Sequence, residues 1–228
     1  MKQTIPQTYT VVPISYSQIK DWLLHKHYAH RIPSISYAFG CYDDNGILQA
    51  VCSFGVPASP SLVKGAFNGA YTDNFLELNR LCASDGLERN VLSYFVSSCL
   101  KLLPKPKVIV SYADSGMNHH GYIYQATNWI YTGLSDAHSE YIVDGNKHSR
   151  HLFDELGGIN KAKECGLELK VGNRSRKHRY FYLLGNKSEI KNMKRKLKYQ
   201  QQPYPKGDNI RYDASYKPTV QMCLFLDL

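Results

Sequence analysis

A short apolar run, Val108-Ile109-Val110, constrains the fold more than any other part of the chain. Three consecutive β-branched residues favour a strand, and the absence of polar alternation predicts a strand that is covered on both faces. Polar side chains follow immediately at Ser111, Tyr112 and Asp114. We therefore expect a central strand over 107–112, in a sheet with helices on both faces, that leads into a functional segment.

The rest of the chain alternates between strand-like and helix-like patterns. An Asp-Asn-Gly turn at 44–46 divides a predicted hairpin over 37–55, since Asn-Gly favours tight hairpin turns. The further elements expected are helices over 15–28 (N-cap Ser17), 91–103 (ended by Pro104), 119–128 and 186–199 (N-cap Asn186 or Ser188), and strands over 75–83, 129–133 and 177–185. This order predicts an α/β fold with a mixed central sheet and helices on both faces.

Composition predicts one folded domain over 1–228, with a basic strand-helix region at 170–198 and an irregular C-terminal tail at 200–228. The chain is 43% hydrophobic and contains no apolar run of membrane-spanning length, and its first residues do not have the order of a signal peptide. Six cysteines lie scattered in mostly apolar stretches, without a Cys-x-x-Cys pair. We expect a soluble cytoplasmic protein with buried thiols.

The net charge of +9 is concentrated in one part of the sequence. Residues 170–198 hold eleven Lys or Arg and one acid, Glu189, a local balance of +10, so the other residues sum to −1. A solvated helix face is one interpretation, but such an excess favours a phosphate-rich partner, here nucleic acid, over a membrane. The residues expected to contact phosphates are Arg174, Arg176, Lys177, Arg179, Lys191, Lys194, Arg195 and Lys198.

Two strand ends are the places where chemistry is expected, because open α/β sheets bind ligands at the carboxyl ends of their strands. After the strand at 75–83, the loop "DGLERNVLS" leads into a helix whose N-terminus could bind an anion with Arg89 and Ser93. At the second end, Asp114 is either a catalytic carboxylate or a turn cap. No His-x-x-x-His pair is present, so a metal site would need remote residues such as His27 and Asp114.

Several collinear blocks resemble one known family. They are "HKHYAHRIPS", "ELNRL" (77–81), "ERNVLS" (88–93), "SYAD" (111–114), "HGYIYQATNWIYTG" (120–133) and "RKHRYFYLLG…PYPKG". Together they resemble the Mom family of phage DNA-modification proteins. The resemblance implies a GCN5-related N-acetyltransferase (GNAT)-like fold and an acyl-CoA cofactor, acetyl-CoA first. It also implies conversion of adenine N6 in double-stranded DNA to a carbamoylmethyl adduct, in the host bacterial cytoplasm, which protects phage DNA from restriction.

The chain departs from GNAT enzymes at the cofactor loop. These enzymes place glycines where a bare backbone approaches the diphosphate, whereas here Leu92 and Tyr94 occupy those spacings. The implied product adds a second difficulty. A carbamoylmethyl group is attached through a methylene carbon, which simple acetyl transfer cannot produce. An unusual donor or a redox metal such as iron therefore stays open.

The resemblance and the strand ends together suggest roles for individual residues. We expect Asp114, Tyr124, Ser111 and Glu77 to be catalytic, with Asp114 and Tyr124 transferring protons. Cofactor contacts are expected from Arg80, Arg89, Asn90, Ser93 and Asn128, and substrate contacts from His27, Tyr28, Arg31, Tyr112, His120, Gln125 and Tyr131. A flipped adenine would stack on Tyr28, Tyr112 or Tyr131. Two alternatives stay open: an N-acetyltransferase acting on a protein or small amine, and a non-catalytic nucleic-acid-binding module.

Overall fold

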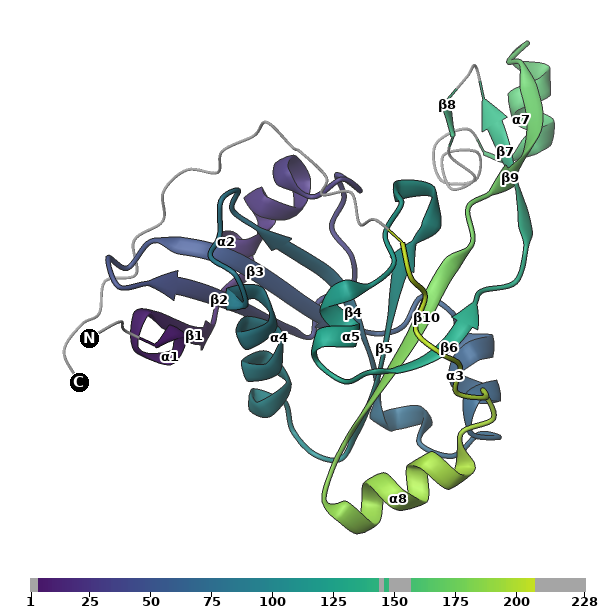
Figure 1. Ribbon diagram of the computed structural model, residues 1–228. Helices are drawn as coiled ribbons and strands as arrows, with labels where there is room; N and C mark the ends of the chain where they lie inside the picture. Colours follow the sequence, from purple (N-terminus) through teal and green to yellow (C-terminus); the bar gives the residue numbers. More distant parts are fainter. Residues whose placement is uncertain (1–3, 144–145, 148–156, 208–228) are drawn as a thin grey trace.

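A computed structural model describes residues 4–143, 146–147 and 157–207, and within them a seven-stranded mixed sheet forms the body of the molecule (Figure 1). The strands lie in the order β1-β2-β3-β4-β5-β10-β6. Their bounds are β1 Tyr9–Pro13, β2 Tyr37–Asp43, β3 Leu48–Gly55, β4 Phe75–Ala83, β5 Lys107–Asp114, β6 Ile130–Leu134 and β10 Lys177–Leu184. The predicted central strand is β5, which extends two residues further than expected.

The pairing of β4 with β5 creates an opening in the sheet. These two strands are parallel, and the other paired neighbours in the seven-stranded sheet are antiparallel. Their register covers only Phe75–Glu77 against Val108–Val110. Both strands then continue without pairing to each other, so their carboxyl ends separate. This is where sequence reasoning placed the site.

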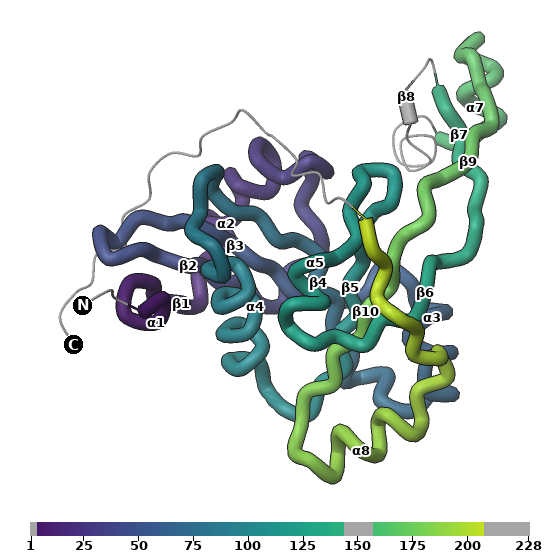
Figure 2. The backbone as a smooth tube through the Cα atoms, in the orientation of Figure 1, coloured from purple at the N-terminus to yellow at the C-terminus, as the bar shows by residue number. Residues whose placement is uncertain are grey.

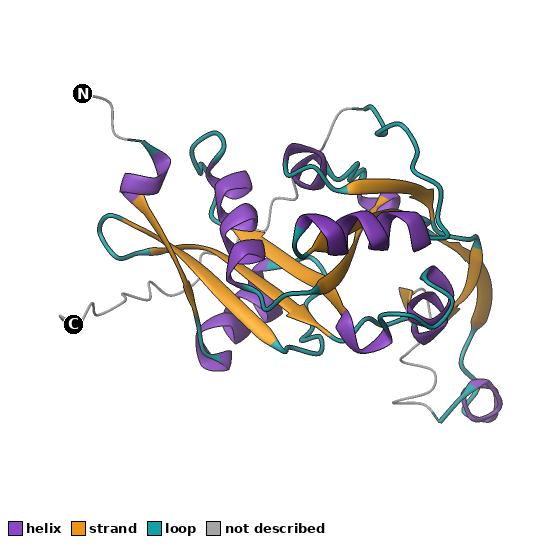
Figure 3. Cartoon of the chain, turned by 90° about the horizontal axis from the view of Figure 1, so that it is seen from below, coloured by secondary structure: helices purple, strands orange, loops and turns teal. Residues whose placement is uncertain are grey.

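Helices cover both faces of the sheet, as predicted (Figure 3). One face, called the α4 face, packs on α1 (Ile5–Thr8), α4 (Val91–Leu102) and α5 (Tyr122–Ala126). The other, called the α8 face, packs on α2 (Tyr16–Asp21), α3 (Pro60–Ala66) and α8 (Lys187–Lys196). The predicted α/β class with a mixed sheet is confirmed. Successive residues of β5 alternate between the faces, with Ile109 on the α4 face and Val110 on the α8 face.

Helix α2, which corresponds to the helix predicted over 15–28, differs from that prediction at both ends. Ser15 caps it rather than Ser17, because the Ser15 hydroxyl accepts the Gln18 N–H while the Gln18 side chain accepts the Ser15 N–H. The α-helix ends at Asp21 and continues as a π-helical turn, η1 (Trp22–Lys26), in which His27 N donates to Trp22 O at 2.9 Å. Such turns recur at functional sites. At the last helix, α8, the same reciprocal bonding selects Asn186 as the cap over Ser188.

Several elements were not expected from sequence. They include β1, α1, α3 and a three-stranded sheet of β7 (His138–Val143), β8 (Asn146–Lys147) and β9 (Leu169–Arg174) with helix α7 (Ile159–Glu164). This small sheet projects from the ends of β6 and β10 as an arm (Figure 2). Its apolar core is small, centred on Val143 and Ala162, so its segments carry little hydrophobic periodicity and were interpreted as loops.

Other sequence expectations have mixed outcomes. Cys41, Cys52, Cys82 and Cys99 are buried as expected, but Cys165 is exposed because it caps the short helix α7 at the surface. Cys223 lies outside the described residues, as does the tail beyond residue 207. Residues 200–207 have no helix or strand. Among the described helices, none combines the length and the apolar character that crossing a membrane requires.

Candidate active site

A cavity of about 580 Å³ lies where β4 and β5 separate. One wall is formed by β4 from Leu78 to Ala83 and by the start of α4, and the opposite wall by the end of β5 and by α5. The turn at Lys26–Tyr28 lines it as well. The cavity thus receives side chains from both faces of the sheet. Of the residues predicted for the site, His27, Tyr28, Arg80, Asn90, Ser93, Tyr112 and Tyr124 line it.

An irregularity in β4 sets the direction of the residues beside the cavity. Ser53 pairs with Arg80 while the next residue, Phe54, pairs with Leu78, so Asn79 is the extra residue of a β-bulge. Its side chain accepts a hydrogen bond from Ser53 at 2.7 Å and donates one to Ser34 O at 2.7 Å. These bonds fix the bulge and hold Arg80, whose Nη1 donates to Asn79 O at 2.6 Å.

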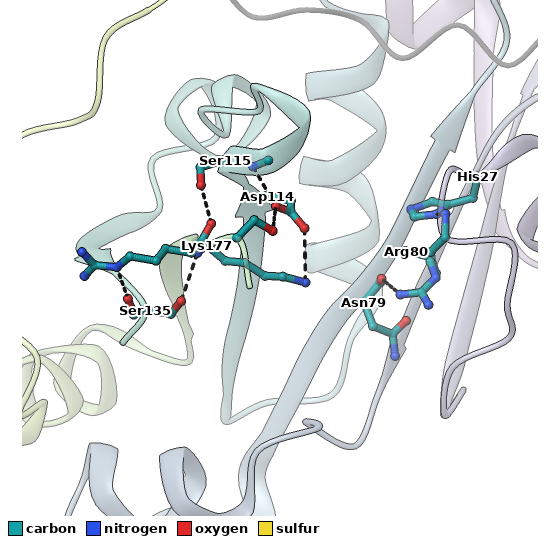
Figure 4. Close-up of polar contacts among 11 residues, drawn as sticks. His27, Asn79, Arg80, Asp114, Ser115, Ser135 and Lys177 are labelled. Carbon is teal, nitrogen blue, oxygen red and sulfur yellow. Dashed lines mark hydrogen bonds and ion pairs between the residues drawn. The ribbon is translucent and has the colours of Figure 1, made fainter. Parts of the chain in front are cut away.

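His27 lies directly after the π-helical turn and is buried, with 7% of its surface exposed. Its ring stacks on Tyr28 with centroids 4.5 Å apart, and Figure 4 shows it beside β4 with Arg80. Burial, followed by the charge of Arg80, lowers the pKa of His27 to about 3. The imidazole is therefore neutral at physiological pH.

On the α8 face, Glu77, Tyr112 and Asp114 lie near the point where β4 and β5 separate, and of these three only Tyr112 is among the residues that line the cavity. Asp114 Oδ1 accepts hydrogen bonds from Gly116 N at 2.9 Å and Ser175 Oγ at 2.7 Å, while Oδ2 lies 3.6 Å from Lys177 Nζ (Figure 4). Asp114 is thus a turn cap with one oxygen facing a cation. Burial raises the pKa of Glu77, against the effects of the Ala58 N–H bond and of Arg80. Burial, then Glu77, raises the pKa of Tyr112.

On the α4 face, Ser111 and Tyr124 form a buried pair. Their hydroxyl oxygens are 2.7 Å apart, and Ser111 also donates to Leu78 O at 2.7 Å. Burial is the largest cause that raises the pKa of Tyr124, so its hydroxyl stays protonated. Tyr124 can donate a proton or a hydrogen bond, but because its hydroxyl is protonated it cannot act as the general base that starts the reaction.

Other predicted residues are not brought to the cavity. His120, Gln125 and Tyr131 contact the α4 side of β10: Tyr131 bonds His178 at 2.8 Å, and Gln125 Nε2 donates to His120 O at 3.0 Å and Pro205 O at 3.3 Å. Polar side chains of the segment that follows β5 therefore hold the stretch 200–207 in place as well as contributing to the cavity. Asn128 is exposed beyond the end of α5, and Arg89 and Arg31 are exposed outside the cavity lining.

Comparison with known proteins identifies the family. The model of the Mom protein family matches residues 8–206. The chain belongs to the Mom protein family. A curated relative, "Methylcarbamoylase mom" of Escherichia phage Mu, is 30% identical over 197 residues, which are 79% of this chain and 77% of the relative.

Solved structures add distant likenesses to this Mom-family chain. A spermidine/spermine N-acetyltransferase of Vibrio cholerae has a TM-score of 0.45 at 9% identity, covering 84% of this chain and 99% of that one. An N-acetyltransferase of Staphylococcus aureus has a TM-score of 0.42 at 10% identity, covering 77% and 98%. At these scores the likeness carries no weight for the reaction.

The start of α4 does not fit the diphosphate of an acyl-CoA in the way that a glycine-rich loop does. Leu92 lines the cavity and packs against the core with Tyr94, so side chains occupy the positions where bare backbone is needed. Glu88 also lines this end and would repel a diphosphate, whereas the charge of Asp85 is compensated by an ion pair with Lys26. The Ser93 hydroxyl donates to Asn90 O at 2.8 Å. Acetyl-CoA stays a prediction from the family resemblance.

Ligands for a metal are not gathered at the site. Across residues 4–143, 146–147 and 157–207, no group of three or more His, Cys, Asp or Glu side chains lies close enough to hold an ion. His27, one of the remote residues considered from sequence, already uses its Nδ1 atom to accept the Ala29 N–H at 3.1 Å. Iron therefore stays a possibility raised by the chemistry of the implied product alone.

The basic region is not one surface. Lys177 pairs with Asp114 at the site end of β5, whereas Leu184, just before α8, pairs with Lys107 at the opposite end. Helix α8 therefore carries its cations at the far end of the sheet from β9 (Figure 1). Arg179 is also engaged within the protein: it donates to Thr132 at 3.0 Å, and its guanidinium lies 3.7 Å from the Tyr199 ring centre.

Sequence reasoning missed several polar residues of the cavity, among them Lys26, Asn79 and His119. Lys26 is buried and pairs with Asp85 at 3.0 Å. It was overlooked because a lysine at the end of an amphipathic helix is normally solvated. Asn79 depends on a bulge, which the alternation of "FLELNRLCA" does not reveal. His119 could have been chosen from the segment that supplied His120, its neighbour.

Proposed function

We propose that this protein is a transferase that places a carbamoylmethyl group on N6 of adenine in double-stranded DNA and so protects phage DNA from restriction. Family membership over residues 8–206 supports group transfer, and the relative named methylcarbamoylase supports the kind of group. The single observation that carries the assignment to a site is the cavity between β4 and β5, because it brings titratable side chains from both faces of the sheet to one space.

The α8 side of the cavity suits the adenine. Tyr28 and Tyr112 line it and can stack on a flipped base. Tyr131, the third aromatic considered, is only 6% exposed and bonds His178 on the other face. Base flipping is proposed because the N6 amine of a paired adenine cannot reach the inside of a cavity. The stacking position is therefore proposed for Tyr28 or Tyr112.

Proton transfer is assigned by environment. Glu77 has a raised pKa, which suits a carboxylate that accepts a proton from the adenine amine, and nearby Arg80 and Lys177 limit that rise. Asp114 is proposed to orient Lys177 at the mouth of the site through its second oxygen. Tyr124 keeps its proton and is proposed as a donor to the leaving group. The donor molecule is left to experiment, since the start of α4 does not fit a diphosphate.

Plasmid protection tests the proposed function. Plasmid DNA from bacteria that express the chain is expected to resist restriction enzymes whose sites contain adenine. Enzymes whose sites contain only guanine and cytosine should cut it fully and serve as the matched control. Complete cutting by both groups, with soluble protein that still binds DNA, would contradict modification and favour the non-catalytic binding module. Consumption of a thioester in the absence of DNA would instead favour a protein or small-amine acceptor.

A further inference from the structure

The protonation state of His27 is fixed by its backbone contacts. The Ala29 N–H donates to His27 Nδ1 at 3.1 Å. A backbone amide can only donate, so Nδ1 must be unprotonated and the neutral ring carries its proton on Nε2. The π-helical turn before His27 places the ring in this contact. In this geometry the imidazole is an N–H donor at the edge of the cavity.

The ring keeps this form across the working pH range. Burial and the Arg80 charge lower its pKa to about 3, with smaller effects from His119, His30 and Arg31. A group that holds so low a pKa neither gains nor loses a proton near neutral pH. His27 is therefore unsuited to general base catalysis and suited to hydrogen-bond donation.

Arg80 supplies a second donor. Its Nη1 is bound to Asn79 O, but its Nε atom is buried, and no described residue accepts a hydrogen bond from it. Native proteins rarely leave buried N–H groups without an acceptor, because the desolvation is unfavourable. The bulge at Asn79 holds the guanidinium against the cavity that His27 also lines.

We propose that His27 Nε2–H and the Arg80 guanidinium bind one oxygen atom of the group-donating molecule, a carbonyl or carboxylate oxygen. An oxygen has two lone pairs and can accept both donors, whereas an adenine ring nitrogen has one. The positive charge of Arg80 disfavours an ammonium group and favours an oxygen that is anionic or becomes so during transfer. The role of the two residues in binding an oxygen rests on the proposed function. The protonation state of His27 rests only on the contact with the Ala29 N–H.

Nitrogen-15 NMR of histidine-labelled protein tests the protonation state without any ligand. The His27 signal is assigned by its loss in His27→Gln. From pH 8 to pH 5 it should show a neutral ring with the proton on Nε2. A proton on Nδ1, or a titration near pH 6.5, would overturn the inference, because His27 would then be a base or an acid.

Modification of cellular DNA tests the shared oxygen. His27→Ala and Arg80→Ala should each reduce the rate of adenine modification by about a hundredfold or more, as for other donors of this kind. His27→Gln should retain more, since its amide also donates. The double variant should lose little beyond the larger single loss; losses that multiply would show that the residues bind different atoms.

Two controls separate this inference from other failures. His25→Ala changes a histidine in the same turn that is 54% exposed, and it should leave modification unchanged. Thermal melting of each variant identifies any loss caused by unfolding. If wild-type protein makes no adduct, the proposed function fails, while the NMR result still decides whether His27 is a fixed donor.

Discussion

The Ser111 hydroxyl donates to the Leu78 carbonyl oxygen at 2.7 Å, just beyond the last paired residues of β4 and β5. A side chain thus continues the link between the strands by one step after their backbones have separated. Tyr124 meets the same hydroxyl from α5. The apex of the cavity, meaning the point where β4 and β5 separate, is therefore held by buried polar contacts rather than by hydrogen bonds between the strands.

Removing the Ser111 hydroxyl should destabilise the fold. Ser111→Ala leaves the Tyr124 hydroxyl and the Leu78 carbonyl without this partner in a buried place, which costs about 1–3 kcal/mol of unfolding free energy. Urea denaturation measures the change. The matched control, Ser93→Ala, removes a hydroxyl at the partly exposed start of α4 and should cost less than about 0.5 kcal/mol. Equal effects would show that the apex is not held in this way.

Two substitutions of Asp114 separate its charge from its capping role. Asp114→Asn keeps an oxygen that can accept from Gly116 N and Ser175 Oγ but removes the charge facing Lys177. We expect Asp114→Asn to melt like the wild type yet lose most DNA modification. Asp114→Ala should also lose about 1 kcal/mol of stability. Full modification by the Asn variant would show that Asp114 only caps the turn and that its charge is not needed for the reaction.

Acid should destabilise the protein through His27. The folded-state pKa is about 3, against 6.5 for the free group, so below pH 6.5 the unfolded chain binds a proton that the folded chain does not. Stability should fall as the pH drops from 6.5 towards 3, by about 2–3 kcal/mol from this residue at pH 4.5. His119 and His178, whose pKa values are lowered chiefly by burial, act in the same direction.

The comparison of wild type with His27→Gln isolates that contribution. Urea denaturation at pH 7.5 and pH 4.5 should show a smaller acid loss in the variant, which retains His119 and His178. An identical loss in both proteins would mean that His27 is protonated in the folded state or exposed.

DNA affinity should depend on the arm more than on helix α8. Strand β10 has eight residues, which span about 25 Å, several times the Debye length in physiological salt. Cations at its two ends therefore act independently. Arg174→Ala, at the site end, should lower the slope of log affinity against log salt by about 0.9, while Lys191→Ala should not. The reverse result would place the DNA along α8.

The sequence was most informative where local chemistry decides the structure. The Asn-Gly turn predicted the hairpin of β2 and β3, and the apolar run at 108–110 predicted a central strand with helices on both faces. Strand β1 was missed because its residues Tyr9–Pro13 are few, end in proline and gain their register only from β2. The same holds for the arm, whose core is too small to impose a pattern.

The position of the candidate site was predictable from the sequence, but its detailed geometry was not. Strand-end reasoning chose the separation of β4 and β5, and Tyr28, Arg80 and Tyr112 do meet there. Neighbours in sequence nevertheless point to opposite faces of a strand, so Ser111 lies on the α4 side and Tyr112 on the α8 side. The bulge at Asn79 and the backbone contact of His27 depend on tertiary structure, which periodicity does not encode.

Mass spectrometry of nucleosides tests the central claim most directly. DNA is taken from bacteria that express the wild-type chain and from bacteria that express Glu77→Gln, which keeps the size of the side chain. We predict a deoxyadenosine species with the mass of the carbamoylmethyl adduct in the first sample and its loss in the second. Unmodified deoxyadenosine in both samples, with folded protein present, would contradict the proposed function, and equal adduct in both would remove Glu77 from the reaction.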